Sequence, residues 1–487
     1  MATQDNAQGK LLARNTTALT VGRLGSKVLV FLLVRFYTAV LTKEEFGTAD
    51  LITSLCNFLI PLACAGLSSG FFRFAAEAKS EREQSSVFSA GVSILLVSSM
   101  GFALLSPLLF LIPLFTQHVW LILLYVLCAN VHYLTSDFIR AQGNYRLFAI
   151  QGILNTALNI SFNLLFLLPL SLGLDGYVLS IIAADLCTSI FLVVYAKLWR
   201  YVSPDAVDRA TVKAILRYSL PLIPAALCWW ITNVSDRYMV THFWGEAQNG
   251  LYAAAYKIPN ILTIACGIFM DAWQFSAVVA SRKAGDSETP EEATERRRSL
   301  RAFFSSIFRG YGAFLFLAAG GLVLLARPIS RLLFDPAFFE AWAYIPVLLL
   351  ATALSALSNF AASVYMVERR GMATMVTSVI GAVLNVGLNL WLIPDKGPMG
   401  AAIATLASYL VVFVLRAIHA RRFIPFRIFP VWLVLNALLL GALCTVVTLS
   451  VRGWVWISLG LCLGLAVIDA PYLIRSAIHL LRRRKNS

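Results

Sequence analysis

The 487-residue chain has little charge. Charged residues make up 13% of the sequence, hydrophobic residues make up 59%, and mean hydropathy is +0.76. A water-soluble domain could not cover so much apolar surface, whereas apolar spans of roughly 20 residues match a hydrocarbon core about 30 Å thick. The net charge of +15 does not indicate nucleic acid, because no run of Lys or Arg is long. The composition therefore predicts an all-α polytopic membrane protein.

Several chemical signatures are missing. The sequence has no G-x-x-x-x-G-K-[ST] motif for ATP, and its five histidines and eight cysteines show neither a C-x-x-C pair nor a metal-ligand spacing. The opening MATQDNAQGK lacks the apolar core and cleavage site of a removable signal peptide, so the first span is the expected insertion signal. We expect no catalytic residues, no metal and no cofactor, and hence a protein that is not an enzyme.

About fourteen segments have the length and apolarity of a membrane helix. If the N-terminus is cytoplasmic, most Lys and Arg residues between spans fall on the inner side, as the positive-inside rule requires. This distribution predicts an even number of spans and two cytoplasmic termini. The predicted spans are 13–41, 49–76, 85–115, 118–141, 147–171, 175–198, 214–242, 248–281, 302–326, 341–367, 371–394, 398–419, 429–450 and 454–479.

An internal repeat predicts the architecture. Leu158–Pro169 reads LNISFNLLFLLP and Leu384–Pro394 reads LNVGLNLWLIP, and in both copies a glycine, Gly176 or Gly400, follows a short turn. Spans one to six therefore repeat as spans seven to twelve in the same membrane orientation, which is a parallel repeat. The predicted domains are a first six-helix bundle (1–198), a cytoplasmic linker (199–213), a second six-helix bundle (214–420), and two C-terminal helices with a basic tail (421–487).

Two cations lie one helical turn apart inside the first span. Arg23 and Lys27 are too deep for both to reach the inner surface comfortably, since Arg23 lies on the order of 15 Å into the span. Charge at membrane depth is costly, so such residues usually face a wet cavity. Arg35 is close enough to the outer end to reach the headgroups. Arg23 and Lys27 therefore predict a site for an anion.

Other polar residues within spans leave two interpretations open. Arg73 and Arg140 are either site cations or residues that face headgroups, and Asp137 and Asp185 are either structural ion-pair partners or coupling residues. The neighbours Asp236 and Arg237 cannot face one another on a helix, so we expect their partners on spans eight or nine. A further cation, Lys257, lies well inside span eight, two residues before Pro259.

Three stretches carry a family resemblance. RLGSKVLVFLLVRFYTAVLTKEEFGTADL, SDRYMVTHFWGEAQNGLYAAAYKIPNIL and the repeated LNxxxNL resemble the polysaccharide and oligosaccharide flippases of the multidrug/oligosaccharidyl-lipid/polysaccharide (MOP) exporter superfamily. The resemblance implies two six-helix bundles around a central cavity, alternating access, and extra C-terminal helices in a bacterial cytoplasmic membrane. It also implies a lipid-linked sugar diphosphate as substrate, carried on undecaprenyl pyrophosphate and moved from the inner to the outer leaflet.

The resemblance extends to residues and partners. It implies that cavity cations hold the pyrophosphate, which applies most directly to Arg23 and Lys27 and less directly to Arg73, Arg140 and Lys257. The implied partners are membrane lipids, a coupling ion (sodium or proton), a polysaccharide polymerase and glycosyltransferases. Three alternatives remain: a flippase for lipid II or another lipid carrier, a cation-coupled drug exporter, and a polyprenyl-sugar glycosyltransferase or polymerase. A drug-cation site would favour carboxylates, and a transferase would need catalytic carboxylates or a large outer loop.

Overall fold

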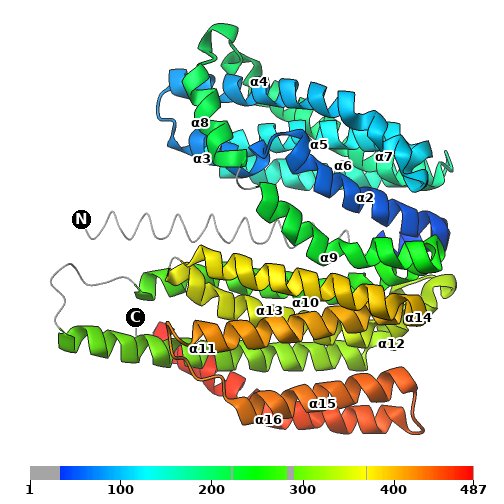
Figure 1. Cartoon of the computed structure of the whole chain (residues 1–487), viewed down its shortest axis with the longest axis vertical. Helices are drawn as coiled ribbons and strands as arrows, with labels where there is room; N and C mark the ends of the chain where they lie inside the picture. Colours follow the sequence, from blue (N-terminus) through cyan, green and yellow to red (C-terminus); the bar gives the residue numbers. More distant parts are fainter. Residues whose placement is uncertain (1–32, 221–222, 282–289, 369, 486–487) are drawn as a thin grey trace. The chain divides into compact units, whose positions relative to one another are not determined.

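The computed structural model describes residues 33–220, 223–281, 290–368 and 370–485 (Figure 1). These residues form helices and connecting turns, with no β-strand among them. Eleven of the described helices are long and apolar enough to cross a membrane. The predicted all-α polytopic fold is therefore confirmed.

The chain forms two compact units that divide between Val234 and Ser235, inside helix α9 (Ile223–Trp244). Residues 33–40 are helical. The longer helices of the first unit are α2 (Lys43–Ala63), α3 (Leu67–Glu77), α4 (Glu81–Leu105), α5 (Val119–Ala141), α6 (Tyr145–Leu167), α7 (Gly173–Tyr195) and α8 (Arg209–Ser219). Short 3₁₀ helices connect them: η1 (Ser106–Leu111), η2 (Pro113–His118), η3 (Leu198–Tyr201) and η4 (Pro204–Ala206).

The predicted continuous span 49–76 is wrong. The helix begins earlier, at Lys43, and breaks between α2 and α3, where Ala65 and Gly66 have φ angles of 51° and 73°. The Gly66 N–H donates to the Pro61 carbonyl at 2.7 Å, which closes the turn. This bond satisfies a carbonyl of the last turn of α2, and glycine readily adopts the left-handed backbone that such a turn requires.

The predicted span 214–242 also begins differently. Helix α8 ends at Ser219 and α9 begins at Ile223. The short α8 packs across α3 and α4 (Figure 1), with Ile215 buried and Arg209, Lys213 and Arg217 exposed. An amphipathic helix of this kind covers the bundle with its apolar face, so its first turns are not part of a spanning segment.

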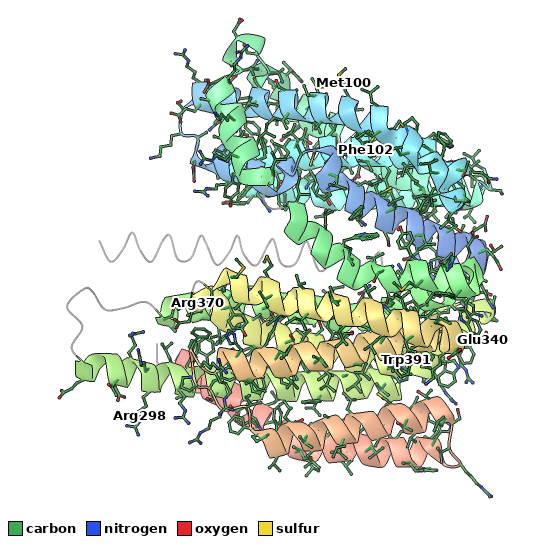
Figure 2. All side chains as sticks on the ribbon, in the orientation of Figure 1. Met100, Phe102, Arg298, Glu340, Arg370 and Trp391 are labelled. Carbon is green, nitrogen blue, oxygen red and sulfur yellow. The ribbon has the colours of Figure 1, made fainter. Side chains whose placement is uncertain are left out.

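The second unit continues with one long helical hairpin after another. Its helices are α10 (Glu246–Ser281), α11 (Pro290–Leu324), α12 (Ala326–Leu333), η6 (Pro336–Ala343), α13 (Ile345–Val367), α14 (Gly371–Ala420), α15 (Pro430–Leu449) and α16 (Trp454–Lys485). The hairpin of α15 and α16 packs on α11 (Figure 1). Helix α11 starts well before the predicted span 302–326, so the C-terminal part of the charged stretch 282–301 is helical. Figure 2 shows Arg298 on this extension projecting away from the neighbouring helices.

Helix α14 consists of two antiparallel arms. Gly397 has non-helical backbone angles (φ 57°, ψ −139°) at the bend. Arg416 on the second arm donates to Thr377 on the first, and Asn385 donates to Thr405 across the same pair of arms. The arms therefore match the predicted spans 371–394 and 398–419. With α9 and the predicted span 13–41, of which only the end is described, the helices are consistent with fourteen spans.

The predicted repeat has the same local structure in both copies. Asn163 donates to Asn159 in α6, and Asn389 donates to Asn385 in α14, each at 2.9 Å between the amide nitrogen and the amide oxygen. Both donor residues, Asn163 and Asn389, are fully buried. Two equivalent polar contacts inside apolar helices agree with a duplicated bundle, while the exact domain bounds stay a prediction.

Many large apolar side chains point away from the helices. Met100 on α4 is 67% exposed and Trp391 on α14 is 71% exposed (Figure 2). Such outward apolar surface would be a liability in water and is normal where helices face lipid tails. The chain is therefore a multi-pass membrane protein.

Candidate functional site

Arg23 and Lys27, the residues of the predicted anion site, lie outside the described residues. Arg35, at the other end of the first predicted span, is exposed. The anion site predicted from the first span therefore stays a prediction.

Arg73 and Arg140 each have an acidic neighbour and an aromatic one. Arg73 pairs with Glu77 at 3.1 Å and lies over the Tyr218 ring at 4.9 Å, in an exposed position on α3. Arg140 pairs with Asp137 at 3.2 Å and lies over the Phe72 ring at 3.9 Å. Asp137 thus has the ion-pair partner that the sequence left open, one helical turn away on α5.

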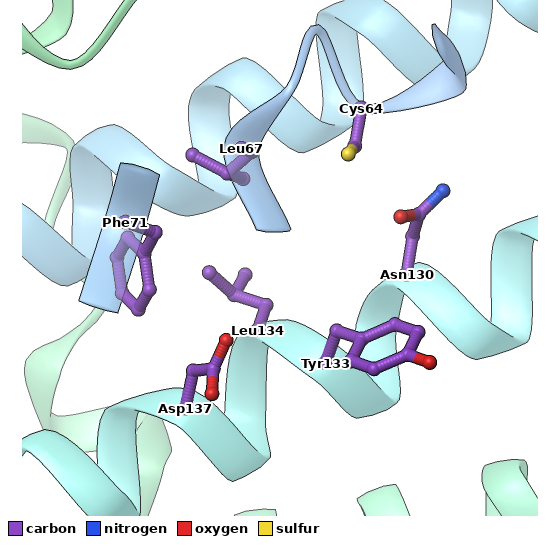
Figure 3. Close-up of a pocket in the computed structure, with 7 residues that line it drawn as sticks. All are labelled: Cys64, Leu67, Phe71, Asn130, Tyr133, Leu134 and Asp137. Atoms are coloured by element: carbon purple, nitrogen blue, oxygen red, sulfur yellow. The ribbon is translucent and has the colours of Figure 1, made fainter. Parts of the chain in front are cut away.

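A small cavity lies beside Asp137 (Figure 3). Its volume is about 10 Å³, and Cys64, Leu67 and Asn130 are among the residues that line it. A space of this size holds at most a single water molecule. It cannot accommodate a sugar or a phosphate group.

Asp185 lies in a hydrogen-bonded network with a histidine that the sequence did not single out. The Asp185 Oδ1 atom is 2.9 Å from His132 Nδ1 and accepts from the Asn155 amide at 2.9 Å. The other ring nitrogen, Nε2, is 2.9 Å from Gln151 Oε1, and the Gln151 amide donates to Ser136. Both ring nitrogens of His132 therefore lie within hydrogen-bond distance of an oxygen atom.

Asp236 is buried at the start of the second unit. Its Oδ2 atom accepts from the Tyr252 hydroxyl at 2.8 Å and the Tyr256 hydroxyl at 3.3 Å, and Arg237 lies over the Tyr256 ring at 4.9 Å. Both tyrosines belong to α10, so the expected partners on span eight are present. Lys257 is partly buried on the same helix.

The second unit contains a cavity of about 400 Å³. One face of α13 contributes residues three or four apart, which places them on a single side of that helix. Among the described lining residues, most polar groups are hydroxyls and amides, and none is a carboxylate. Its lining residues are Thr263, Cys266, Gly267, Met270, Gln274, Tyr311, Thr352, Ser355, Ala356, Asn359, Ala362, Ser363, Met366 and Thr374.

Arg416 is a buried cation that the sequence did not single out. It stands near the inner end of the predicted span 398–419, yet it is only 6% exposed inside the second unit. Its guanidinium donates to Thr377 (3.0 Å), Ser358 (3.2 Å), Ser378 (2.7 Å) and Asn359 (3.5 Å). Only the folding of α14 onto itself and onto α13 reveals this burial.

Solved structures with a similar fold are transporters. The chain resembles the lipid II flippase MurJ in an inward closed conformation, with a TM-score of 0.69, 12% identity, and coverage of 94% of this chain and 99% of that one. It resembles an inward-facing multidrug resistance MATE family transporter of the MOP superfamily, with a TM-score of 0.62, 16% identity, and coverage of 83% and 98%. It also resembles the Vibrio cholerae MATE transporter VcmN, with a TM-score of 0.55, 15% identity, and coverage of 86% of this chain and 98% of that one. At these identities the likeness shows the fold.

Sequence comparison gives the family. No curated protein sequence matches the chain significantly. The family model for polysaccharide biosynthesis proteins matches residues 12–273, more than half of the chain. That range covers all six predicted spans of the first bundle, α9 and most of α10. It includes residues 23–51 and 235–262, two of the stretches that carry the family resemblance. The chain belongs to the polysaccharide biosynthesis protein family and has the fold of the MOP superfamily.

Proposed function

We propose that the protein is a flippase that moves a sugar chain linked to undecaprenyl diphosphate from the inner to the outer leaflet by alternating access. The cavity of the second unit carries this proposal. Its hydroxyl and amide lining offers hydrogen bonds to sugar hydroxyls, and its volume of about 400 Å³ falls in the range of small-molecule sites, roughly 300–1,000 Å³. A sugar headgroup loses its water in hydrocarbon unless polar walls of this kind replace it.

Cations within the predicted spans complete the proposed mechanism. Arg23 and Lys27 hold the diphosphate, with Arg73, Arg140 and Lys257 as further cations along its route. Guanidinium groups suit bidentate phosphate contacts, and an ammonium acts as a compact charge. The undecaprenyl chain stays in lipid while the headgroup passes.

Asp185 is the residue we assign to proton coupling. Its contact with His132 joins α5 to α7, and Asn155 adds α6, so three spans meet at one titratable pair. Loss of a proton from His132 removes one of the two hydrogen bonds unless the Gln151 amide turns over. A protonation event there therefore alters how these spans hold together.

Reconstituted translocation tests the proposal. Purified protein in liposomes should move a defined undecaprenyl diphosphate-linked oligosaccharide across the bilayer, faster with an imposed proton gradient. Arg23→Gln with Lys27→Gln should reduce the rate at least tenfold, because each lost charge-assisted contact is worth about 1.5–3 kcal/mol. The matched control Arg82→Gln removes an exposed charge at the start of α4 and should leave the rate unchanged.

The same assay separates the alternatives. Movement of lipid II in preference to the oligosaccharide would identify the peptidoglycan precursor as the transported substrate. Movement of an organic cation and of no lipid-linked sugar would favour a drug exporter and overturn the proposal. Normal translocation by the correctly inserted double variant would refute the proposal that Arg23 and Lys27 hold the diphosphate.

A further inference from the structure

The guanidinium of Arg416 has no acidic partner in the part of the chain that the structure describes. Its nitrogens donate to three hydroxyl oxygens and one amide oxygen, all neutral. No described carboxylate oxygen lies within 4.0 Å of it. A guanidinium cannot lose its proton in a protein, so Arg416 carries a buried charge with no carboxylate counter-ion among the described residues.

A buried cation of this kind needs an anion. Neutral dipoles replace only part of the lost hydration, and charge inside a membrane bundle generally faces a partner or a wet cavity. The unit offers such a cavity next to Arg416. Asn359 connects the two, because its Oδ1 atom accepts from Arg416 Nη1 at 3.5 Å and the residue also lines the cavity.

Asn359 is oriented by this contact. Since its carbonyl oxygen faces Arg416, its amide nitrogen lies on the other branch of the side chain, and that nitrogen makes no hydrogen bond to the described residues. Asn359 is exposed and lines the cavity, and Thr374 from α14 contributes a hydroxyl to the same lining. The wall therefore presents N–H and O–H donors with a positive charge directly behind them.

We propose that this wall is a second binding site for the substrate's diphosphate, with Asn359 in contact with the phosphate and Arg416 as the positioning residue that orients Asn359 and supplies the charge. The identity of the anion as a lipid-linked diphosphate rests on the proposed function. The binding chemistry itself, an oxyanion held by an amide and hydroxyls before a guanidinium, is equally suited to free pyrophosphate. Hydroxyl and amide groups farther along the cavity then receive the sugar.

Binding measurements on the purified full-length protein test the site. The probes are undecaprenyl diphosphate in detergent micelles, undecaprenol as its uncharged counterpart, and inorganic pyrophosphate. Arg416→Gln should weaken binding of undecaprenyl diphosphate at least tenfold and leave undecaprenol unaffected. Arg421→Gln, an exposed cation just after the end of α14, is the matched control and should bind like the wild type.

Asn359→Asp distinguishes a ligand site from a structural contact. The new carboxylate would pair with Arg416, so thermal stability should be maintained or raised, while the negative charge in the cavity wall should repel the diphosphate and abolish binding. If both Arg416→Gln and Asn359→Asp change thermal stability without changing affinity, Arg416 only fastens α13 to α14 and the inference is wrong. Asn359→Asp also decides the case if Arg416→Gln fails to fold.

The comparison of probes identifies the anion. It also separates this inference from the proposed function. Arg416-dependent binding of pyrophosphate but not of the lipid would overturn the lipid assignment. Arg416-dependent lipid binding by a wild type that does not translocate lipid-linked sugar would refute the proposed function and leave the site in place. Normal translocation with binding unaffected by either variant would refute the site alone.

Discussion

His132 lies between two oxygen acceptors in the first unit, and Arg416 lies among neutral oxygens in the second. Both are charged or titratable groups inside helices that must cross an apolar medium. Such groups are costly there, which is the reason we propose roles in proton and anion handling for them. At the residue scale, the two units differ: one holds a histidine–carboxylate pair, and the other holds a guanidinium with no described acidic neighbour.

Asp185→Asn should uncouple transport from the proton gradient. The amide can still accept a hydrogen bond from His132 but removes the charge that favours the doubly protonated ring. We expect translocation in liposomes to lose its acceleration by an imposed pH gradient while substrate binding persists. Asp175→Asn, which disrupts the more exposed pair of Asp175 with His118 (3.1 Å), is the control and should keep the acceleration. Acceleration retained in Asp185→Asn would exclude Asp185 as the coupling residue.

Sequence reasoning identified Asp185 but neither His132 nor Arg416. Asp185 is recognisable because an acid in an apolar span is rare. His132 is separated from Asp185 by 53 positions, and nothing in its local sequence indicates the pairing. Arg416 stands close to the end of its predicted span, where cations commonly reach the headgroups, so only its three-dimensional neighbours distinguish it.

At the element scale, the hairpins of the repeat depend on close backbone approach. Gly176 in the first copy and Gly400 in the second both lie against backbone of the preceding span, with Phe166 and Leu392 as the respective neighbours. A Cβ atom at Gly400 would overlap the Leu392 carbonyl, a rigid group. The glycine therefore sets how tightly the two arms of α14 meet at their bend.

Gly400→Ala should lower stability by about 1–3 kcal/mol, because the overlap must be relieved by a backbone shift. Gly387→Ala is the matched control on the same helix, since no heavy atom lies within 4 Å of the added Cβ. Thermal unfolding in detergent should show a lower midpoint for Gly400→Ala and an unchanged or slightly higher one for Gly387→Ala, where alanine is the better helix former. Equal midpoints for the two variants would contradict the tight packing of the arms.

At the scale of the whole molecule, the proposed direction of transport depends on topology. The positive-inside distribution predicts that the loop before α11 lies in the cytoplasm and that the turn between α15 and α16 lies outside. Arg298 and Arg452 are exposed residues that report these two sides.

Single-cysteine labelling checks this topology. In a chain whose eight native cysteines are replaced, Arg452→Cys should react with a membrane-impermeant maleimide in intact cells, and Arg298→Cys should react only after the membrane is permeabilised. The two sites control for each other, because both are exposed cations outside the apolar spans. The reverse pattern would invert the orientation and with it the inner-to-outer direction of the proposed transport.

The sequence by itself determined the class of this protein. Three signals are visible in the sequence without coordinates: the length of the apolar segments, the positive-inside bias and the LNxxxNL repeat. Together they predicted the all-α membrane fold and the paired arms of α14. The tertiary structure alone decided the break at Ala65 and Gly66, the contact of His132 with Asp185, and the burial of Arg416 beside the cavity. These features depend on which spans pack together, and the bilayer imposes apolarity on all spans alike without specifying their neighbours.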